Sequence, residues 1–570
     1  MKLETKLISS LGKVFPDAIA GEELRTASVL EDEPFSFQIA FRNDPFTKTV
    51  THLYVRVETD LEPGSVSEYL VSYVPVMRAD VPGTDGFFDR KTPGLYPDML
   101  LRRRTNARVE DDGRWGPRYI EQDQDNLLAA VSDSYQALWF TVNEEGRTMR
   151  PGGYRIRVLF YNAESGEQLA GESLALEIVP AKLSENAPFY TNWFHCDCLA
   201  DIYGTEVFSD RFFGIMRSFV KTAAVHGMNT ILLPAFTPPL DTTPGKERRT
   251  AQLVGVEVTR DGYSFDFSLM KRYIGLCLEC GIGYFEHSHL FTQWGAEHAP
   301  KVMAADGTGT RRIFGWETDA GGKEYTAFLK SYLRALKAFL CGEGLEKRIL
   351  FHVSDEPDLE HLASYRRARE AVAEEMEGFP CADAVSHYEF YEKGLTERPI
   401  VVVSSPDMEK FVRNCGDYWV YYTGAQVMDG CSNRIIPATS ARNRAIGVQM
   451  YAGGANGFLH WGYNYYYGFL SHGLFDPAKD PCGYNKLAGT CFVVYPGTGG
   501  EAIPSLRMKV FQEGLNDCRA LRRLETLAGR EAALAFLEER LGRVDYHFCP
   551  DGKTLLGFRE SLNREIGKYL

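Results

Sequence analysis

The stretch Arg348-Ile-Leu-Phe-His-Val-Ser-Asp-Glu-Pro-Asp-Leu-Glu360 contains the transition that decides the fold. Its first half is a largely apolar run, residues 348–354, and its second half is polar and leads into an amphipathic segment over residues 359–377. A short apolar run bounded by turn residues predicts a buried strand, and a helix directly after it is typical of a parallel sheet. The stretch therefore predicts one unit of strand, loop and helix.

The same unit recurs through the middle of the chain. Strands are predicted at residues 189–196, 229–236, 282–288, 348–354, 382–387, 400–404, 418–423 and 457–462, and helices at residues 210–226, 268–280, 325–341, 359–377 and 439–451. Eight strands alternating with helices fit a (β/α)8 TIM barrel with insertions better than an open sheet. Two alternating runs about Asp261-Gly262 predict that one insertion, residues 254–266, is a β-hairpin.

The two ends of the chain have different patterns. Short alternating runs separated by Gly, Pro and Asp predict an antiparallel β-sandwich over residues 1–183, interrupted by an irregular stretch over residues 79–130. Helical spacing predicts a mostly helical C-terminal extension over residues 506–570, with a short β-like piece at residues 546–558. We thus expect three parts: a β-sandwich domain (1–183), a barrel domain (184–505) and the helical extension (506–570).

The composition is that of a folded protein. Hydrophobic residues make up 44%, charged residues 25% and aromatic residues 13% of the chain, which excludes a disordered or collagen-like protein. Lys and Arg total 63 against 77 for Asp and Glu, a formal net charge of −14. Such an acidic field repels nucleic acids and anionic membranes, so we expect neither as a partner.

The N-terminal residues lack the apolar core of a signal peptide, and no later stretch approaches the about 20 apolar residues of a membrane span. We therefore expect a soluble, cytoplasmic protein with twelve reduced cysteines. Two pairs, Cys196/Cys198 and Cys277/Cys280, have spacing that resembles a metal site. The first spacing is short for zinc and the second lies in a helical pattern, so scattered core residues are the favoured interpretation.

Polar and aromatic residues gather where the predicted strands end, which is where barrel active sites lie. Aromatic rings can cover the apolar face of a sugar while polar groups bind its hydroxyls. We therefore predict that this group binds a carbohydrate substrate. Its members are His195, Asp197, His287, Trp294, His387, Tyr388, Tyr421, Trp461, Tyr463 and Asn464.

Each part of this group has another interpretation. Residues 354–360 could be only the capped start of a helix, and residues 463–467 only a packed loop. His195, His287, His289 and His387 could form a metal site with Asp197, but they show no metal-binding motif, so we expect no metal and no cofactor. Nucleotide-binding and serine-hydrolase motifs are also lacking in a suitable context.

The adjacent carboxylates Asp355 and Glu356 narrow the possible chemistry. Retaining glycosidases hold an acid and a nucleophile about 5–5.5 Å apart, usually on different strands. Neighbouring carboxylates suit another route, in which the substrate's own 2-acetamido oxygen attacks the anomeric carbon. One carboxylate then orients the amide and the other protonates the leaving oxygen. Repulsion between the two helps to keep the acid protonated.

The chain resembles glycoside hydrolase family 123 and related domains that share its catalytic region. The matching segments are Gly94-Leu-Tyr-Pro-Asp98, Pro151-Gly-Gly-Tyr154, Gly227-Met-Asn-Thr230, Phe236-Thr-Pro-Pro239, His352-Val-Ser-Asp-Glu-Pro357, Gly457-Phe-Leu-His-Trp-Gly-Tyr-Asn464, Phe492-Val-Val-Tyr-Pro-Gly497, Ser505-Leu-Arg507 and Glu513-Gly-Leu-Asn-Asp517. Their order along nearly the whole chain makes the resemblance specific, although each segment alone is weak.

This resemblance implies an N-terminal β-sandwich, a (β/α)8 catalytic domain and an exo-acting retaining β-N-acetylgalactosaminidase or hexosaminidase. Asp355 would orient the acetamido group and Glu356 would be the general acid/base. Two alternatives stay open: a non-catalytic carbohydrate-binding protein on a barrel scaffold, and a retaining glycosidase for a sugar without an acetamido group. In the second alternative Glu286 would be the nucleophile.

Overall fold

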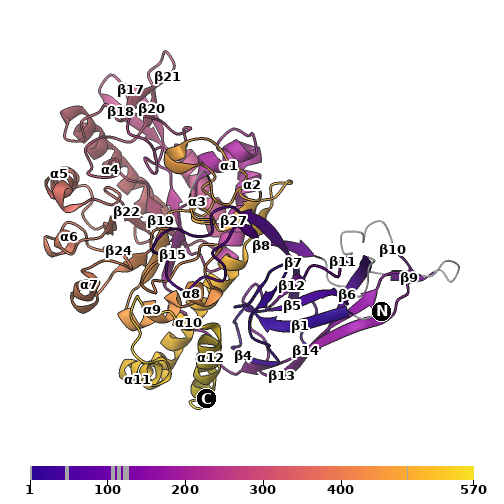
Figure 1. Ribbon diagram of the computed structural model, residues 1–570. Helices are drawn as coiled ribbons and strands as arrows, with labels where there is room; N and C mark the ends of the chain where they lie inside the picture. The colour runs from indigo at the N-terminus through magenta and orange to yellow at the C-terminus, as the bar shows by residue number, and fades with distance from the viewer. Residues whose placement is uncertain (1–2, 45–49, 104–108, 112–116, 120–127, 484–485) are drawn as a thin grey trace.

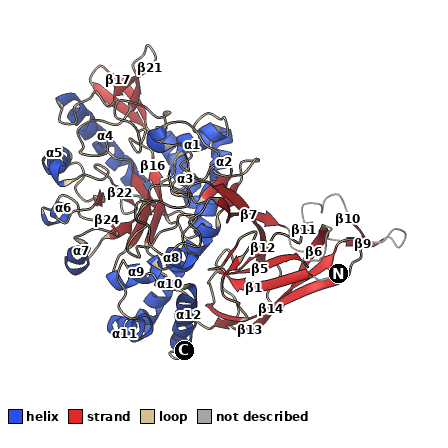
Figure 2. Ribbon diagram, in the orientation of Figure 1, coloured by secondary structure: helices blue, strands red, loops and turns tan. Residues whose placement is uncertain are grey.

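The computed structural model describes residues 3–44, 50–103, 109–111, 117–119, 128–483 and 486–570. A body of sheets at the N-terminal end adjoins a larger body in which helices surround short strands (Figures 1 and 2). The N-terminus lies on the sheet body and the C-terminus beside helix α12 (Figure 1).

The N-terminal body consists mainly of two five-stranded sheets. One contains, in spatial order, β1 (Leu3–Ser9), β5 (Phe35–Asn43), β12 (Gln136–Val142), β7 (Val66–Val76) and β8 (Gly94–Arg103). The other contains β11 (Leu128–Ala130), β6 (Thr51–Thr59), β13 (Gly152–Asn162), β14 (Gln168–Val179) and β4 (Thr26–Leu30). Two short pairs accompany them, β2 (Lys13–Val14) with β3 (Ile19–Ala20), and β9 (Val109–Asp111) with β10 (Pro117–Tyr119).

Alternation along the strands builds the core of this body. Phe37 and Phe41 of β5 share one face of their strand, because strand side chains point to alternate sides. They belong to one buried cluster with Val158 and Phe160 of the other sheet. Strand β8 lies inside the stretch predicted to be irregular, so that prediction is wrong for residues 94–103. Much of residues 104–127 is outside the described part of the chain.

All eight strands predicted in the middle of the chain are present and parallel. One sheet has the order β15 (Phe189–Asn192), β26 (Gly457–His460), β25 (Trp419–Tyr421), β24 (Ile400–Val402), β23 (Ala384–Val385), and the other the order β16 (Thr230–Leu233), β19 (Tyr284–His287), β22 (Ile349–Phe351). The two sheets meet at both edges. Asn229 N donates to Tyr190 O at 3.1 Å, and Phe351 forms a parallel bridge with Cys381.

Helices follow most of these strands. They are α1 (Cys196–Ile202), α2 (Asp210–Val225), α3 (Ser268–Cys280), α4 (Lys323–Glu343), η2 (Leu359–His361), α5 (Leu362–Ala371), α6 (Glu389–Glu392), α7 (Met408–Asn414), α8 (Ser440–Arg444), α9 (Ile446–Gly453) and η3 (Phe469–Ser471). The predicted hairpin is β17 (Gly255–Thr259) with β18 (Gly262–Asp266); it joins β20 (Val302–Ala305) and β21 (Thr310–Phe314) in a separate sheet at the top of Figure 1. A last pair, β27 (Val494–Pro496) and β28 (Ala502–Pro504), precedes the C-terminal helices.

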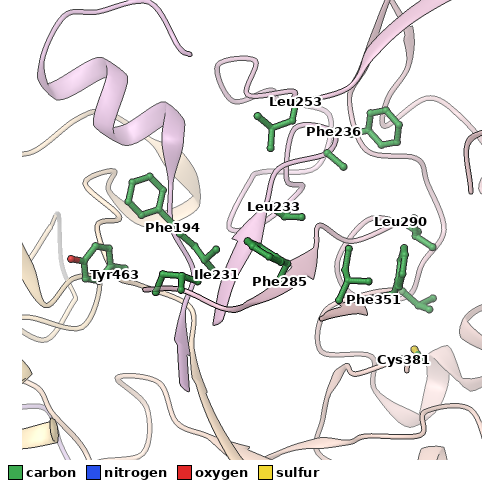
Figure 3. Packing of buried hydrophobic residues seen from close by; sticks show 14 of the residues in the cluster. Phe194, Ile231, Leu233, Phe236, Leu253, Phe285, Leu290, Phe351, Cys381 and Tyr463 are labelled. Carbon is green, nitrogen blue, oxygen red and sulfur yellow. The ribbon is translucent and has the colours of Figure 1, made fainter. Parts of the chain in front are cut away.

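The short parallel strands are buried on both faces. Ile231, Phe285 and Phe351, from three adjacent strands, lie in the large cluster that includes residues of the surrounding helices (Figure 3). Intervening residues such as Leu232 and Leu350 lie in a second cluster with Trp419 and Tyr421 of the other sheet. The alternation therefore divides each strand into a face toward the helices, here called the outer face, and a face toward the other sheet, here called the inner face.

The C-terminal segment contains α10 (Leu506–Ala528), α11 (Arg530–Leu541) and α12 (Gly552–Gly567). Helix α10 is packed against both bodies. Its Arg507 makes two hydrogen bonds of 2.9 Å to Asp98 of β8, and its Asp517 makes bonds of 2.7 and 2.9 Å to Arg444 of α8. The segment is therefore part of the shared core rather than an appended extension.

The β-like piece predicted at residues 546–558 is wrong. Asp551 caps α12 by accepting a 2.7 Å hydrogen bond from Thr554 N, so the Asp-Gly pair that suggested a hairpin turn starts a helix. Asp favours both turns and helix N-caps, and the helical spacing of Leu555, Phe558 and Leu562 decides between them.

All twelve cysteines lie in the described part of the chain and are free thiols. Among the described helices, none combines the length and apolarity that crossing a membrane requires.

Stability should fall in mild acid, in part because of buried histidines. Burial, together with the charge of Lys509, lowers the pKa of His226 to about 4. The folded chain then binds fewer protons than the unfolded chain, whose histidines titrate near about 6.5. The contribution of His226 is complete above that pH and is lost as the pH falls toward 4, by up to about 1.4 kcal/mol per pH unit. Urea unfolding from pH 7 to pH 4.5 measures this loss.

The variant His226→Gln isolates this contribution from the other titrating groups. Its free energy of unfolding should depend less steeply on pH than that of the wild type, whereas His472→Gln, at an exposed position, should not change the slope. Parallel curves for wild type and His226→Gln would contradict the assignment.

Candidate active site

The carboxylates Asp355 and Glu356 lie just beyond the end of β22. Asp355 is half-buried and Glu356 is exposed. Neither caps the following helix, because the cap is Asp358, whose side chain accepts a hydrogen bond of 2.6 Å from Leu359 N. The interpretation of this segment as a helix start therefore explains Asp358. It does not explain Asp355 and Glu356, which do not cap the helix.

The charge of Glu356 influences the protonation of Asp355. Desolvation raises the pKa of Asp355 well above its usual range, and the adjacent Glu356 carboxylate adds to this rise because like charges repel. The two groups are adjacent in sequence and titrate as a pair. The pair therefore retains a proton at a pH where isolated carboxyl groups are ionised, as a general acid requires.

Tyr421, on the inner face of β25, fixes the position of Glu356. Its hydroxyl donates a 2.6 Å hydrogen bond to Glu356 Oε1. Burial and the neighbouring carboxylate raise the pKa of Tyr421 well above its usual range, so its hydroxyl stays protonated and donates. The structure thus brings together one predicted binding residue and one predicted catalytic residue from different strands.

The loops around the pair are strained. Asp241, Trp294 and Glu356 have φ values of +43°, +57° and +45°, a region that residues other than glycine rarely adopt. The loops are held by hydrogen bonds: Gln293 Oε1 accepts from Asp241 N at 2.8 Å, and Asp355 O accepts from Trp294 N at 2.9 Å. Strain of this kind concentrates at functional sites.

Two aromatic rings near the strand ends remain accessible. Trp294 is 43% exposed, and Trp461 is half-buried with Lys486 Nζ 4.4 Å from its ring centroid. His387 is half-buried, and its Nε2 lies 3.1 Å from Asp358 Oδ1. Tyr388, also half-buried, packs against the ring of Phe411.

Three further predicted residues form a buried support. Asp197 accepts two hydrogen bonds of 2.7 Å from Arg248. His195 lies between Arg248 and the carbonyl oxygen of Trp461, and burial lowers its pKa to about 4. Asn464 bonds both the N–H and the carbonyl oxygen of His195. This cluster holds the loops in place and is buried from solvent.

Two predicted residues lie away from the group. His287 is on the outer face of β19, and its Nε2 is 2.7 Å from the Tyr332 hydroxyl of α4. Tyr463 is buried in the large outer cluster, and its hydroxyl donates a 2.8 Å hydrogen bond to Phe219 O of α2 (Figure 3). Both side chains point toward the helices, so the structure does not bring them to the carboxylates.

A buried polar cluster lies between the two sheets, and of its members only Glu286 was named, as the nucleophile of an alternative reaction. Glu286 is fully buried and accepts hydrogen bonds from Thr191, from Trp193 at 3.1 Å and from His352 at 2.9 Å. Burial alone would lower the pKa of His352, but contacts with Asp383 and Glu286 outweigh it and raise the pKa to about 9. In the sequence, this cluster is indicated only by period-two alternation, which places Glu286 and His352 on the same face of β19 and β22.

Loss of the Tyr421 hydroxyl should impair the pair without unfolding the protein. We expect Tyr421→Phe to lower the turnover number by about tenfold to a hundredfold, the effect of losing a hydrogen bond to a charged group. Because this bond holds Glu356 in position, the loss should appear in kcat more than in KM. Steady-state kinetics on the wild type and the variant measure the two constants separately.

Tyr203→Phe is the matched control, since it removes a 2.9 Å hydrogen bond to Gly497 O. It should leave kcat unchanged. Equal effects of the two variants would show that Tyr421 acts only through stability.

Comparisons with known proteins identify one family model and one solved structure that the chain resembles. The family model described as the catalytic domain of glycoside hydrolase 123 matches residues 193–524. A solved family 123 glycoside hydrolase from Clostridium perfringens, studied for glycolipid glycan hydrolysis, aligns with 100% of this chain and 97% of its own, at a TM-score of 0.70 and 13% identity. At that identity the likeness shows the fold.

Other structural matches are weaker. The Clostridium thermocellum endo-1,4-beta-D-xylanase 10B covers 90% of this chain and 96% of its own, with a TM-score of 0.32 and 8% identity. No curated protein sequence matches the chain.

Proposed function

The chain belongs to glycoside hydrolase family 123, and from this we propose that it is an exo-acting, retaining β-N-acetylgalactosaminidase or hexosaminidase that uses the substrate's 2-acetamido group. Membership of the family makes it a glycosidase that acts on a carbohydrate. The identity of the sugar and the route of hydrolysis are the content of the proposal.

The proposed reaction has two steps. In the first, the acetamido oxygen forms a bond to the anomeric carbon, the glycosidic bond breaks, and Glu356 gives its proton to the leaving oxygen. Asp355 accepts a hydrogen bond from the amide N–H and stabilises the positive charge of the cyclic intermediate. In the second, Glu356 takes a proton from water as the water oxygen bonds to the anomeric carbon, and the bond from that carbon to the acetamido oxygen breaks, which restores the acetamido group. Two inversions at that carbon give retention.

The observation that carries the proposal is the placement of the available carboxylates. Asp355 and Glu356 are adjacent in sequence just beyond the end of β22. Of the two, Glu356 accepts the hydrogen bond from the Tyr421 hydroxyl. Glu286, the nucleophile required by a glycosidase that lacks substrate assistance, is fully buried, and both its oxygens accept hydrogen bonds. This favours the substrate-assisted route over a covalent one.

Substrate binding can place the proton of the pair correctly. An amide N–H donating to Asp355 favours the ionised form of that carboxylate. The proton retained by the pair is then favoured on Glu356, where the leaving oxygen needs it. In this scheme Trp294 and Trp461 supply surfaces for the sugar ring, and His387 a polar contact, while His195, Asp197 and Asn464 support the loops.

The architecture that we propose for this activity is a β-sandwich domain (1–183), a (β/α)8 barrel (184–505) and a helical C-terminal segment (506–570). The shared core of the two N-terminal sheets supports the first. The contacts at both edges of the two parallel sheets support a closed ring of eight strands. The free thiols favour a reducing compartment, which supports a cytoplasmic location.

Aryl β-glycosides test the activity. We expect hydrolysis of the N-acetylgalactosaminide, slower or equal hydrolysis of the N-acetylglucosaminide, and no hydrolysis of the galactoside, which has a 2-hydroxyl group. NMR of the first-formed product should show the β-anomer. Hydrolysis of the galactoside with a trapped glycosyl-enzyme would favour a covalent route, and binding of sugars without any turnover would favour a non-catalytic protein.

A further inference from the structure

We propose that His289, His352 and Asp383 form a binding site for a divalent transition-metal ion, with Zn²⁺ as the best fit. The three residues lie beyond the ends of β19 and β22 and just before β23, and all are buried. The inference does not depend on which sugar the protein hydrolyses. It departs from the expectation of a metal-free protein, which weighed His289 with a different set of residues and rested on the lack of a sequence motif.

The spacing of one pair of these ligand atoms equals that expected around a metal ion. One nitrogen or oxygen from each of the three residues lies within 4.8 Å of the other two. His352 Nδ1 and Asp383 Oδ1 are 3.4 Å apart, longer than the usual hydrogen bond of about 2.9 Å. Ligands about 2.0–2.1 Å from a tetrahedral zinc lie about 3.3–3.4 Å from each other. The observed separation matches that edge.

Both ring nitrogens of His289, Nδ1 and Nε2, are buried and lack a hydrogen-bond partner within the described chain. His289 is only 1% exposed, and its ring stacks on that of His352 with centroids 4.6 Å apart. Burial of unpaired polar atoms is costly, so each such atom requires an explanation. A metal ion would bind one nitrogen of each ring.

The contacts around these residues are those that metal ligands usually make. His352 Nε2 lies 2.9 Å from Glu286 Oε2, and a carboxylate there directs the lone pair of the other ring nitrogen outward. Asp383 is oriented by Val353 N, at 2.9 and 3.1 Å, and by the Tyr365 hydroxyl. Three protein ligands leave one position of a tetrahedron for water. Imidazole and carboxylate donors together suit zinc.

The same residues could instead hold a proton, with His352 as an imidazolium between Glu286 and Asp383. That arrangement would satisfy His352 but would leave His289 stacked on a cation with both of its nitrogens unpaired. A metal ion binds one nitrogen of each histidine and places its positive charge near Asp355, three residues after His352. The two arrangements differ in a direct measurement of metal binding.

Cobalt is the probe, because tetrahedral Co²⁺ absorbs visible light whereas Zn²⁺ does not. The full-length protein is stripped with a chelator and titrated with Co²⁺ in the absence of sugar. We expect absorption between about 500 and 650 nm that saturates at one equivalent per chain and is displaced by Zn²⁺. Zn²⁺ should also raise the thermal midpoint of the stripped protein.

Variants identify the site. His289→Ala should abolish the saturable absorption and the Zn²⁺-dependent rise in thermal midpoint, and His289→Phe, which keeps a ring in the stack, provides a second test if the smaller side chain impairs folding. His472→Ala, at an exposed position, should bind as the wild type does. The proposal is overturned if the stripped wild type shows no saturable binding, or if a folded His289 variant binds equally well. Neither result would bear on hydrolysis of the acetamido sugar.

Discussion

Glu356→Gln should lower the turnover number for an aryl N-acetylgalactosaminide with a poor leaving group by about 10²- to 10⁴-fold, the usual contribution of a general acid. Gln keeps the size of the side chain and can still accept the hydrogen bond from Tyr421, but it cannot donate a proton. Glu356 is exposed, so the free energy of unfolding should change little.

The dependence on leaving group distinguishes a lost acid from a distorted site. The leaving group of a dinitrophenyl glycoside needs little protonation. Glu356→Gln should therefore break the glycosidic bond of this substrate, the first step of the reaction, at nearly the wild-type rate. A methyl glycoside should be almost inert. Glu360→Gln changes a nearby exposed carboxylate and serves as the control. If Glu356→Gln slowed both substrates equally, Glu356 would not be the acid.

Asp355→Asn should lower the turnover number by about 10²- to 10³-fold, the effect of removing one group that stabilises charge in a transition state. The expected pattern is the opposite of that for Glu356→Gln. Asp355 acts on formation of the ring with the acetamido group, which precedes or accompanies departure of any leaving group. Good and poor leaving groups should therefore be slowed to a similar extent.

An inhibitor that resembles the cyclic intermediate gives a second measurement. A thiazoline derived from N-acetylgalactosamine should bind the wild type much more tightly than Asp355→Asn, because the carboxylate contacts the ring nitrogen. Glu360→Gln, which changes a nearby exposed carboxylate, is the control. If Asp355→Asn bound the inhibitor as tightly as the wild type does, Asp355 would not be the residue that orients the acetamido group.

The positions of strands and helices in the middle of the chain could be predicted because their signals are local. Helix α3 spans the predicted residues, 268–280, and the eight strands all lie within their predicted ranges. The strands are shorter than predicted because the polar residues at their ends leave the sheet to form loops. The β-like prediction near Asp551 failed because one local signal, Asp-Gly, is compatible with two structures.

Which of the candidate residues lie together could be predicted only in part. Period-two alternation shows that Glu286 and His287 point to opposite sides of β19, but not which side faces the other sheet. Parallel strands are apolar on both faces, so hydrophobicity does not decide the question. Packing decides it: His287 contacts α4, and Glu286 joins the buried cluster with His352.

Some segments that carry the family resemblance have a structural role. Asp98 in Gly94-Leu-Tyr-Pro-Asp98 bonds Arg507 of Ser505-Leu-Arg507, and it also accepts a 2.5 Å hydrogen bond from Tyr495. Asp517, from another of the segments, bonds Arg444. These buried ion pairs join α10 to both bodies. Some of the residues that carry the resemblance therefore stabilise the fold and do not take part in the chemistry.

By itself, the sequence determined the eight strands, most of the helices and the adjacency of Asp355 and Glu356, because these depend on neighbouring residues. The tertiary structure decided which side chains meet: Tyr421 reaches Glu356 across 65 residues, and Arg507 reaches Asp98 across 409. It also decided that Glu286, His289, His352 and Asp383 share one buried cluster. These contacts depend on how the two sheets and α10 pack together. Residues that are distant in sequence carry no local signal of that packing.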